Sequence, residues 1–195
     1  MPLSVIATFL TFTVITAFTP GPNNILALSS GSRYGFKGCM PVVAGICLGF
    51  LCVMAACGAM SLYVSEVSGN VIIVMKYVGC LYIVWLAWSV ATSDNGKQSA
   101  EQKSSGFIEG LILQFVNVKI IIYGLTAFTA FVLPYYGSVT EILCATLVLT
   151  FIGSAGVVTW ALAGSVLQTF LVRHAKVANT VMGLMLLGCA VNLVR

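Results

Sequence analysis

The first apolar segment of the chain contains a stretch that breaks helices. The segment extends from about Leu3 to Ser30, and residues 18–24 inside it read FTPGPNN. As one straight helix it would be about 40 Å long, which exceeds the roughly 30 Å of a bilayer's hydrocarbon core. Backbone groups freed by a break are tolerated in lipid only where they are buried in protein or line a wet cavity. The sequence therefore predicts an interrupted helix, with either a packed kink or a polar site at the interruption.

The residues of this break favour a polar site. Those that supply its chemistry are Pro20, Gly21, Pro22, Asn23 and Asn24. Each proline lacks a backbone N–H and clashes with the carbonyl four residues earlier, which frees the carbonyls of Thr16 and Phe18. The glycine lets the chain turn where a side chain would obstruct it, and the asparagines add donors and acceptors. One proline alone would favour a packed kink, but this combination favours a site.

The composition is that of an integral membrane protein. Hydrophobic residues make up 59% of the chain and charged residues only 7%, whereas a soluble domain carries about 25% charged residues. The apolar stretches are close to the roughly 20 residues that a helix needs to cross a membrane, and they lack the alternation of barrel strands. We expect an all-α integral membrane protein with one transporter domain over residues 1–195. Its six transmembrane helices are expected at about residues 3–30, 41–64, 71–91, 107–133, 140–167 and 177–193.

Basic residues indicate which loops face the cytoplasm. The loops after the first, third and fifth spans carry Arg33, Lys37, Lys97, Lys103, Arg173 and Lys176. The other two turns carry Glu66 and Glu141 and almost no basic residue. The positive-inside rule therefore places the odd-numbered loops in the cytoplasm and both termini in the periplasm. The net charge of +4 is scattered between spans, so it does not indicate a nucleic-acid partner.

The chain divides into two halves with three expected spans each. Residues 92–106 form its longest polar stretch and are expected to be a cytoplasmic connector between residues 1–91 and 107–195. Because three is odd, the second half enters the membrane from the opposite side, and halves that share a fold would form an inverted repeat. Each half opens with an unusual span, which is the best sequence indication of a transporter site.

The unusual span of the second half carries polar residues at depth. Residues 114–119 read QFVNVK and lie near the middle of the fourth expected span. Polar groups at that depth are costly in lipid, so they suggest a function. Lys119 lies about a dozen residues into the span, where its amine reaches the interface only with strain. The alternative is a lysine that reaches a wet vestibule merely to avoid lipid.

The two ends of a broken helix suit the two charges of a small amino acid. The freed carbonyls of Thr16 and Phe18 can receive an ammonium, and the half-helix that starts near Pro22 presents N–H groups to a carboxylate. Lys119 can pair with the same carboxylate. Three amides can orient either group: Asn23, Asn24 and Asn117. No Asp or Glu lies deep in a span, so the second positive charge of a lysine-like substrate would lack a counter-ion.

Small residues predict two close helix contacts. Gly45 and Gly49 form a G-x-x-x-G motif, and Ala155, Thr159 and Ala163 recur every four residues. Both patterns let helix backbones approach closely. Packing inside the chain is the favoured interpretation of the glycine motif, and a homodimer is the alternative.

The seven cysteines do not indicate redox or metal chemistry. They form no C-x-x-C pair, and Cys47, Cys52 and Cys57 are spaced so that they fall on different faces of a helix. A six-span thiol-redox protein would use cysteines in its first and fourth spans, which contain none here. The chain also lacks a phosphate-binding G-x-x-x-x-G-K-[ST] motif. We therefore expect no enzyme, cofactor or metal. A structural subunit is the other alternative, although it would have little need of Asn117 and Lys119.

Four stretches of the chain carry a family resemblance. They read PGPN at 20–23, RYGFKG at 33–38, KYVGCLYIVW at 76–85 and GF at 106–107, with Asn117 and Lys119 downstream. Together they resemble the LysE/RhtB family of amino-acid exporters. The resemblance implies proton-driven export of small neutral amino acids, with cysteine and O-acetylserine expected, across the bacterial inner membrane. The family usually has proline at the position of Val118, so we expect a milder interruption in the fourth span.

Overall fold

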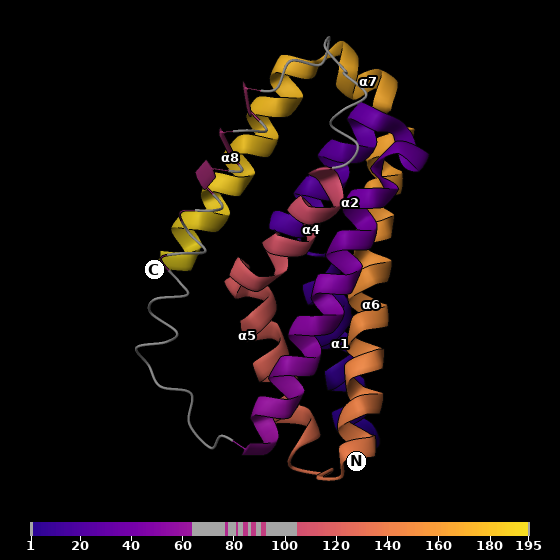
Figure 1. The fold of residues 1–195 in the computed structure, drawn as a ribbon, viewed down its shortest axis with the longest axis vertical. Helices are drawn as coiled ribbons and strands as arrows, with labels where there is room; N and C mark the ends of the chain where they lie inside the picture. The colour runs from indigo at the N-terminus through magenta and orange to yellow at the C-terminus, as the bar shows by residue number, and fades with distance from the viewer. Residues whose placement is uncertain are drawn as a thin grey trace.

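The described part of the chain is helical throughout. The computed structural model describes residues 2–63, 77, 81, 84–85, 87–88, 91–92 and 105–194, and these residues contain no strand. The expected all-α class is therefore confirmed, whereas most of the third expected span and the connector lie outside the described residues. The helices are α1 (Leu3–Phe18), α2 (Pro22–Tyr63), α4 (Ser105–Val116), α5 (Val118–Thr126), the π-helix η2 (Ala127–Val132), α6 (Val139–Val166), α7 (Gln168–Arg173) and α8 (Ala175–Val194) (Figure 1).

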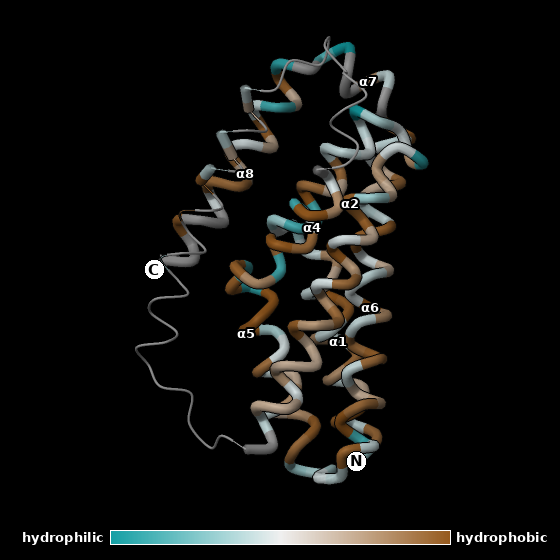
Figure 2. Tube along the Cα trace, in the orientation of Figure 1, coloured by the Kyte–Doolittle hydropathy of each residue, from teal (hydrophilic) through white to brown (hydrophobic). Residues whose placement is uncertain are grey.

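Several of these helices are suited to a membrane. Two helical segments are long and apolar enough to cross a membrane: Pro22–Ser61 and Val139–Val166. The bent pair Gly106–Val116 and Val118–Val132 is a third candidate if its two helices form one span. Apolar residues cover much of α5 and α6, while hydrophilic residues gather at the end where α7 lies (Figure 2). The protein is thus a membrane-embedded helical protein, and the count of six spans stays a prediction.

A sharp turn divides α2 into two arms. Gly35 has φ 66° and ψ 175°, a left-handed φ that glycine adopts without steric cost. Asn23 and Phe50 lie on opposite sides of this turn yet line the same cavity, so the second arm runs back along the first. The loop expected between the first two spans is therefore reduced to one tight turn.

The predicted interruption of the first span is present. α1 ends at Phe18 and α2 begins at Pro22. The last backbone bond of α1 runs from the Thr19 N–H to the Ile15 carbonyl at 2.9 Å, and Thr19 then adopts an extended conformation with φ −65° and ψ 135°. Extended backbone is what the residue before a proline prefers, so Pro20 ends the helix.

A second interruption lies at Asn117. The segments on its two sides are bent by 55°, and Asn117 itself has φ −83° and ψ 90°. Its carbonyl accepts from the N–H groups of Ile120 at 2.9 Å and Ile121 at 3.3 Å, so α5 begins as a new helix. The interruption of the fourth span is therefore present, and it forms without a proline at Val118.

The second arm of α2 packs against α4 through glycines. A methyl group at Gly45 would collide with the Phe107 carbonyl, and one at Gly110 would collide with the Val42 carbonyl. Four residues further along α2, a methyl group at Gly49 would collide with the side chain of Gln114. From Gly45 to Gly49 the contacts therefore advance in the same direction along both helices, so the two run parallel. The G-x-x-x-G motif is therefore used inside the chain, as favoured, and it offers no support for a homodimer.

The first arm of α2 packs against α6 in the same way. A methyl group at Gly31 would collide with the Ala161 carbonyl, and one at Gly164 would collide with the Leu28 carbonyl. Asn23 and Val157 line one cavity, and a methyl group at Gly31 would also be 3.2 Å from the Ser165 nitrogen. The contacts advance together along both helices, so these helices also run parallel. The predicted small-residue seam was placed on the wrong face, since Thr159 is exposed.

Apolar side chains fill the space between these helices in two clusters. One includes Ile25, Ile46 and Leu113, and the other includes Met54 and Phe128, all of them almost fully buried. The bundle is formed by α1, α2, α4, α5 and α6, and α8 lies along one side of it (Figure 1).

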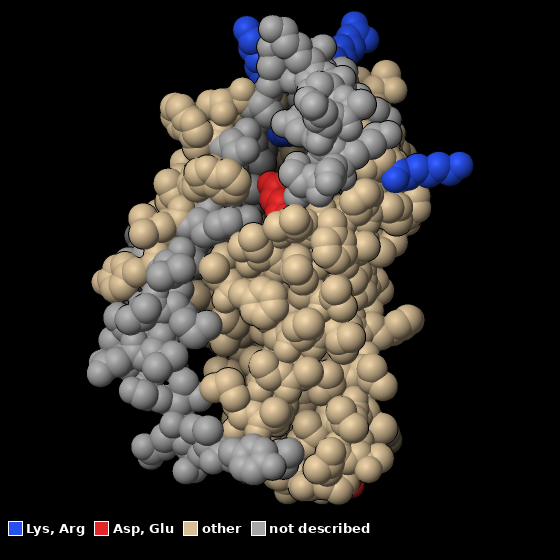
Figure 3. All heavy atoms as spheres, in the orientation of Figure 1, with Lys and Arg blue, Asp and Glu red and all other residues tan. Residues whose placement is uncertain are grey.

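Basic side chains gather at one end of the molecule (Figure 3). Arg33 and Lys37 flank the turn of α2, while Arg173 ends α7 and Lys176 lies in the first turn of α8. Because α2 contacts α7, the first and fifth expected loops lie together. This agrees with their expected location on one side of the membrane.

We expect Gly45→Ala to lower the stability of the purified protein by about 1–3 kcal/mol, because the added methyl group overpacks the contact with α4. Gly188→Ala is the matched control, since a methyl group there meets no described atom within 4 Å. Thermal unfolding in detergent, followed by size-exclusion chromatography, measures the difference. Equal melting temperatures for both variants would contradict the packing described here.

Candidate functional site

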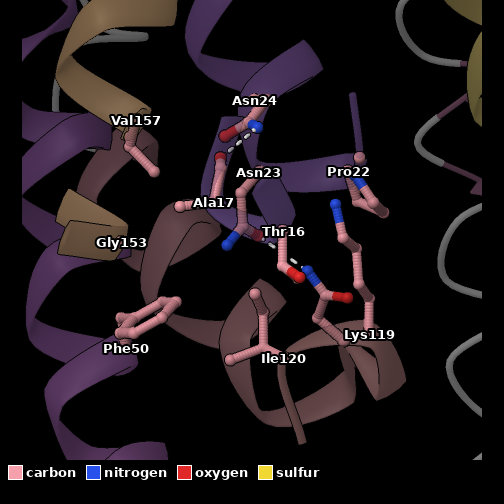
Figure 4. A pocket seen from close by; sticks show the side chains of 12 residues that line it. Thr16, Ala17, Pro22, Asn23, Asn24, Phe50, Lys119, Ile120, Gly153 and Val157 are labelled. Atoms are coloured by element: carbon pink, nitrogen blue, oxygen red, sulfur yellow. Dashed lines mark hydrogen bonds between the residues drawn. The ribbon is translucent and has the colours of Figure 1, made fainter. Parts of the chain in front are cut away.

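The two interruptions meet at one small cavity (Figure 4). Its volume is about 20 Å³, which is room for about one water molecule. Residues of α1, α2, α5 and α6 and of both breaks line it: Thr16, Ala17, Gly21, Pro22, Asn23, Asn24, Phe50, Asn117, Lys119, Ile120, Gly153 and Val157. None of these described residues is acidic.

Most of the residues predicted for the site line this cavity. The structure brings together Thr16, Gly21, Pro22, Asn23, Asn24, Asn117 and Lys119. Phe18 and Pro20 are the exceptions, because their side chains are exposed and neither lines the cavity. These two residues contribute through the backbone, where they form the end of α1.

Three buried amides form a hydrogen-bonded network across the two breaks. The Asn23 Nδ2 donates to the Gln114 Oε1 at 2.8 Å, and the Gln114 Nε2 donates back to the Asn23 Oδ1 at 3.0 Å. The Asn117 Nδ2 donates to the same Asn23 Oδ1 at 2.8 Å. Residues 91 and 94 positions apart are thereby joined in the interior, where satisfied polar networks fix a unique arrangement.

One atom of this network has no partner. Asn117 is 1% exposed, and its Oδ1 receives no hydrogen bond from the part of the chain that the structure describes. Buried acceptors of this kind are rare, and leaving one unpaired costs about 1–3 kcal/mol. The oxygen belongs to a residue that lines the cavity, so it can accept from a donor bound there.

Side chains bind the carbonyls that the first break frees. The Asn24 Nδ2 donates to the carbonyls of Ala17 and Thr19, both at 2.9 Å. The Trp160 Nε1 donates to the Phe18 carbonyl at 3.2 Å. The Phe18 carbonyl, which we expected to receive an ammonium, thus already has a donor from α6.

The side chain of Lys119 extends from α5 to the break between α1 and α2. Its Nζ donates to the Thr19 carbonyl at 3.0 Å, and its side chain extends toward Pro22 (Figure 4). A methyl group at Gly21 would be 3.0 Å from the Nζ, so the glycine permits this close approach. The ammonium lies beside the N-terminal end of α2, which also carries partial positive charge. This corner of the cavity is therefore suited to a carboxylate.

Some residues of the amide network and of the cavity lining were not among the predicted site residues. Gln114 belongs to the network but does not line the cavity. It precedes Asn117 by three residues, a spacing that predicts two side chains on one helix face. Phe50 and Gly153 come from apolar helices and carry no polar signal. A methyl group at Gly153 would be 2.5 Å from the Phe50 ring, so the ring fills the space that the glycine leaves.

Comparisons with known proteins agree with the resemblance. A family model described as LysE type translocator matches residues 14–195. The cysteine/O-acetylserine efflux protein of Salmonella typhimurium (strain LT2) is 42% identical over 188 residues, which is 96% of each chain. The protein of the same name from Escherichia coli (strain K12) is 42% identical over 193 residues, which is 99% of each chain. No solved structure matches. The chain belongs to the LysE type translocator family.

Proposed function

We propose that this protein is a secondary exporter of small neutral amino acids across the bacterial inner membrane, with cysteine and O-acetylserine as substrates. Family membership and the names of the relatives support export. The observation that carries the proposal is the convergence of two helix breaks on one cavity lined by Lys119 and by Asn117, whose Oδ1 has no partner among the described residues.

The cavity suits a zwitterion with an uncharged side chain. The substrate carboxylate binds at Lys119 and the N-terminal end of α2, near Pro22. The substrate ammonium donates to the Asn117 Oδ1 in the same cavity that Thr16 lines. The described lining has no carboxylate for a second positive charge, so the site favours cysteine and O-acetylserine over dibasic amino acids.

Transport requires the helices around the cavity to separate. A cavity of about 20 Å³ is too small for an amino acid, because ligand pockets usually measure some hundreds of Å³. The first arm of α2 moves with α6, and the second arm moves with α4, since glycine contacts hold each pair together. In our proposal these pairs rock against each other and expose the site alternately to the two sides.

The helix pairing supports two inverted three-helix repeats, residues 1–91 and 107–195. In such a repeat, the first span is equivalent to the fourth and the second span to the fifth. The contact between the first and fifth spans is therefore equivalent to the contact between the fourth and second spans. Both contacts are parallel and depend on glycines, at Gly31 and Gly164 in one pair and Gly45 and Gly110 in the other. The basic end then faces the cytoplasm and both termini are periplasmic.

No observation favours the alternatives to transport. The cysteines that the structure describes are free, and they include Cys39, Cys47 and Cys57. None of these described cysteines lines the cavity between the breaks, so the cavity offers no support for a thiol-redox function. A structural subunit would not explain the buried amide network.

We expect Lys119→Met to lower the export rate by about tenfold or more, because a charge-assisted hydrogen bond contributes about 1.5–3 kcal/mol. Asn117→Ala and Pro22→Ala should also reduce export without preventing membrane insertion. Uptake of radiolabelled O-acetylserine into inverted vesicles, normalised to the amount of inserted protein, measures the rate. Lys176→Met is the matched control, because it removes an exposed lysine at the basic end. Normal rates in all three site variants would refute the assignment.

We further expect export to be coupled to protons, so that a protonophore reduces uptake into energised inverted vesicles to the equilibrium level. The substrate enters these vesicles as protons leave their acidic interior, which is antiport. A pH-sensitive dye verifies that the gradient is lost, and a carrier of known coupling serves as control. Uptake that persists after collapse of the gradient would show facilitated diffusion instead.

A further inference from the structure

A continuous set of aromatic rings leads away from the cavity. Phe50, which lines the cavity, contacts Tyr123 with ring centroids 5.9 Å apart. Tyr123 stacks on Phe12 at 5.7 Å, and Phe12 stacks on Phe131 at 5.5 Å. Phe131 in turn contacts Phe9 at 5.7 Å. We call these five rings the aromatic barrier.

A second cavity lies at the far side of the aromatic barrier. Its volume is about 260 Å³, and its lining includes Phe9, Val132, Tyr136 and one face of α6. Phe9 belongs to both the barrier and this cavity, as Phe50 belongs to both the barrier and the first cavity. Phe9 also precedes the end of α1 by nine residues, which is about 13 Å along the helix. The barrier therefore separates the polar cavity from a wider one nearer the start of α1.

The middle of the aromatic barrier contains a polar atom. Tyr123 is 3% exposed, and its hydroxyl has no hydrogen-bond partner among the described residues. Burying a hydroxyl without a hydrogen-bond partner is unfavourable, and phenylalanine would fill the same space without this cost. The residue also lies one helical turn beyond Lys119, on the same face of α5. A polar solute that leaves the carboxylate corner of the cavity would meet this hydroxyl next.

We propose that the substrate leaves the polar cavity through the aromatic barrier and that the Tyr123 hydroxyl hydrogen-bonds to it on the way. This inference rests on the proposed export function. The barrier is closed in this structure, and its rings separate when a small zwitterion passes. The phenol donates to the carboxylate of the solute or accepts from its ammonium, which replaces the water that the apolar rings exclude.

Tyr123→Phe tests the role of the hydroxyl because it keeps the ring. We expect export of radiolabelled O-acetylserine to slow roughly 3- to 10-fold, as for the loss of one hydrogen bond. Equilibrium binding of the same compound to the purified protein should change by less than about two-fold, since the cavity is intact. Tyr135→Phe is the matched control, because that tyrosine is exposed and lies outside the aromatic barrier.

Phe12→Ala tests the barrier itself. Removing this ring should open a leak, so that substrate runs down its gradient faster than in the wild type after a protonophore is added. Rates of export and leak equal to those of the wild type in both variants would overturn the inference. A loss of binding in Tyr123→Phe as large as its loss of export would also overturn it.

These outcomes would leave the proposed function intact if the wild type exports and Lys119→Met does not. A wild type that does not export would overturn both.

Discussion

A break in a membrane helix is stable only when other groups bind the backbone that it frees. The end of α1 meets this constraint with donors from three different helices. The carbonyls of Ala17, Phe18 and Thr19 receive side chains from α2, α6 and α5, which are Asn24, Trp160 and Lys119. The break therefore also holds these helices together. Two of these donors, Asn24 and Lys119, also line the cavity, so in the proposed function they lie where a substrate would bind.

The amide network has a corresponding role between the two helix pairs. Asn23 belongs to the pair formed with α6, while Gln114 and Asn117 belong to the segments beside the second arm of α2. In the proposed transport mechanism, motion between the pairs separates this network and the contact of Gly153 with the Phe50 ring. Opening of the cavity would then expose the amides to water or substrate. The same groups can thus fix the closed arrangement and recognise the ligand.

The sequence predicted those features that depend on local chemistry. The break at Pro20 follows from the geometry of proline, and it is present. The break at Asn117 forms although Val118 is not a proline, because Asn117 starts a new helix and hydrogen-bonds to Asn23 across the interior. Trp160 binds a carbonyl 142 positions away, and a sequence pattern contains no signal for such a contact. Local rules therefore predicted the first break and most of the polar residues that line the cavity, whereas the hydrogen-bond partners of these residues depended on the fold.

In the function proposed here, one substrate molecule binds where the two helix breaks meet. An experimental structure of the purified protein with O-acetylserine bound tests this proposal. We expect the ligand to lie between α1, α2 and α5, with its carboxylate at Lys119 and its ammonium at the Asn117 Oδ1, in a cavity wider than the present one. A ligand bound elsewhere, with the Asn23 and Gln114 amides still paired around a closed cavity, would contradict it.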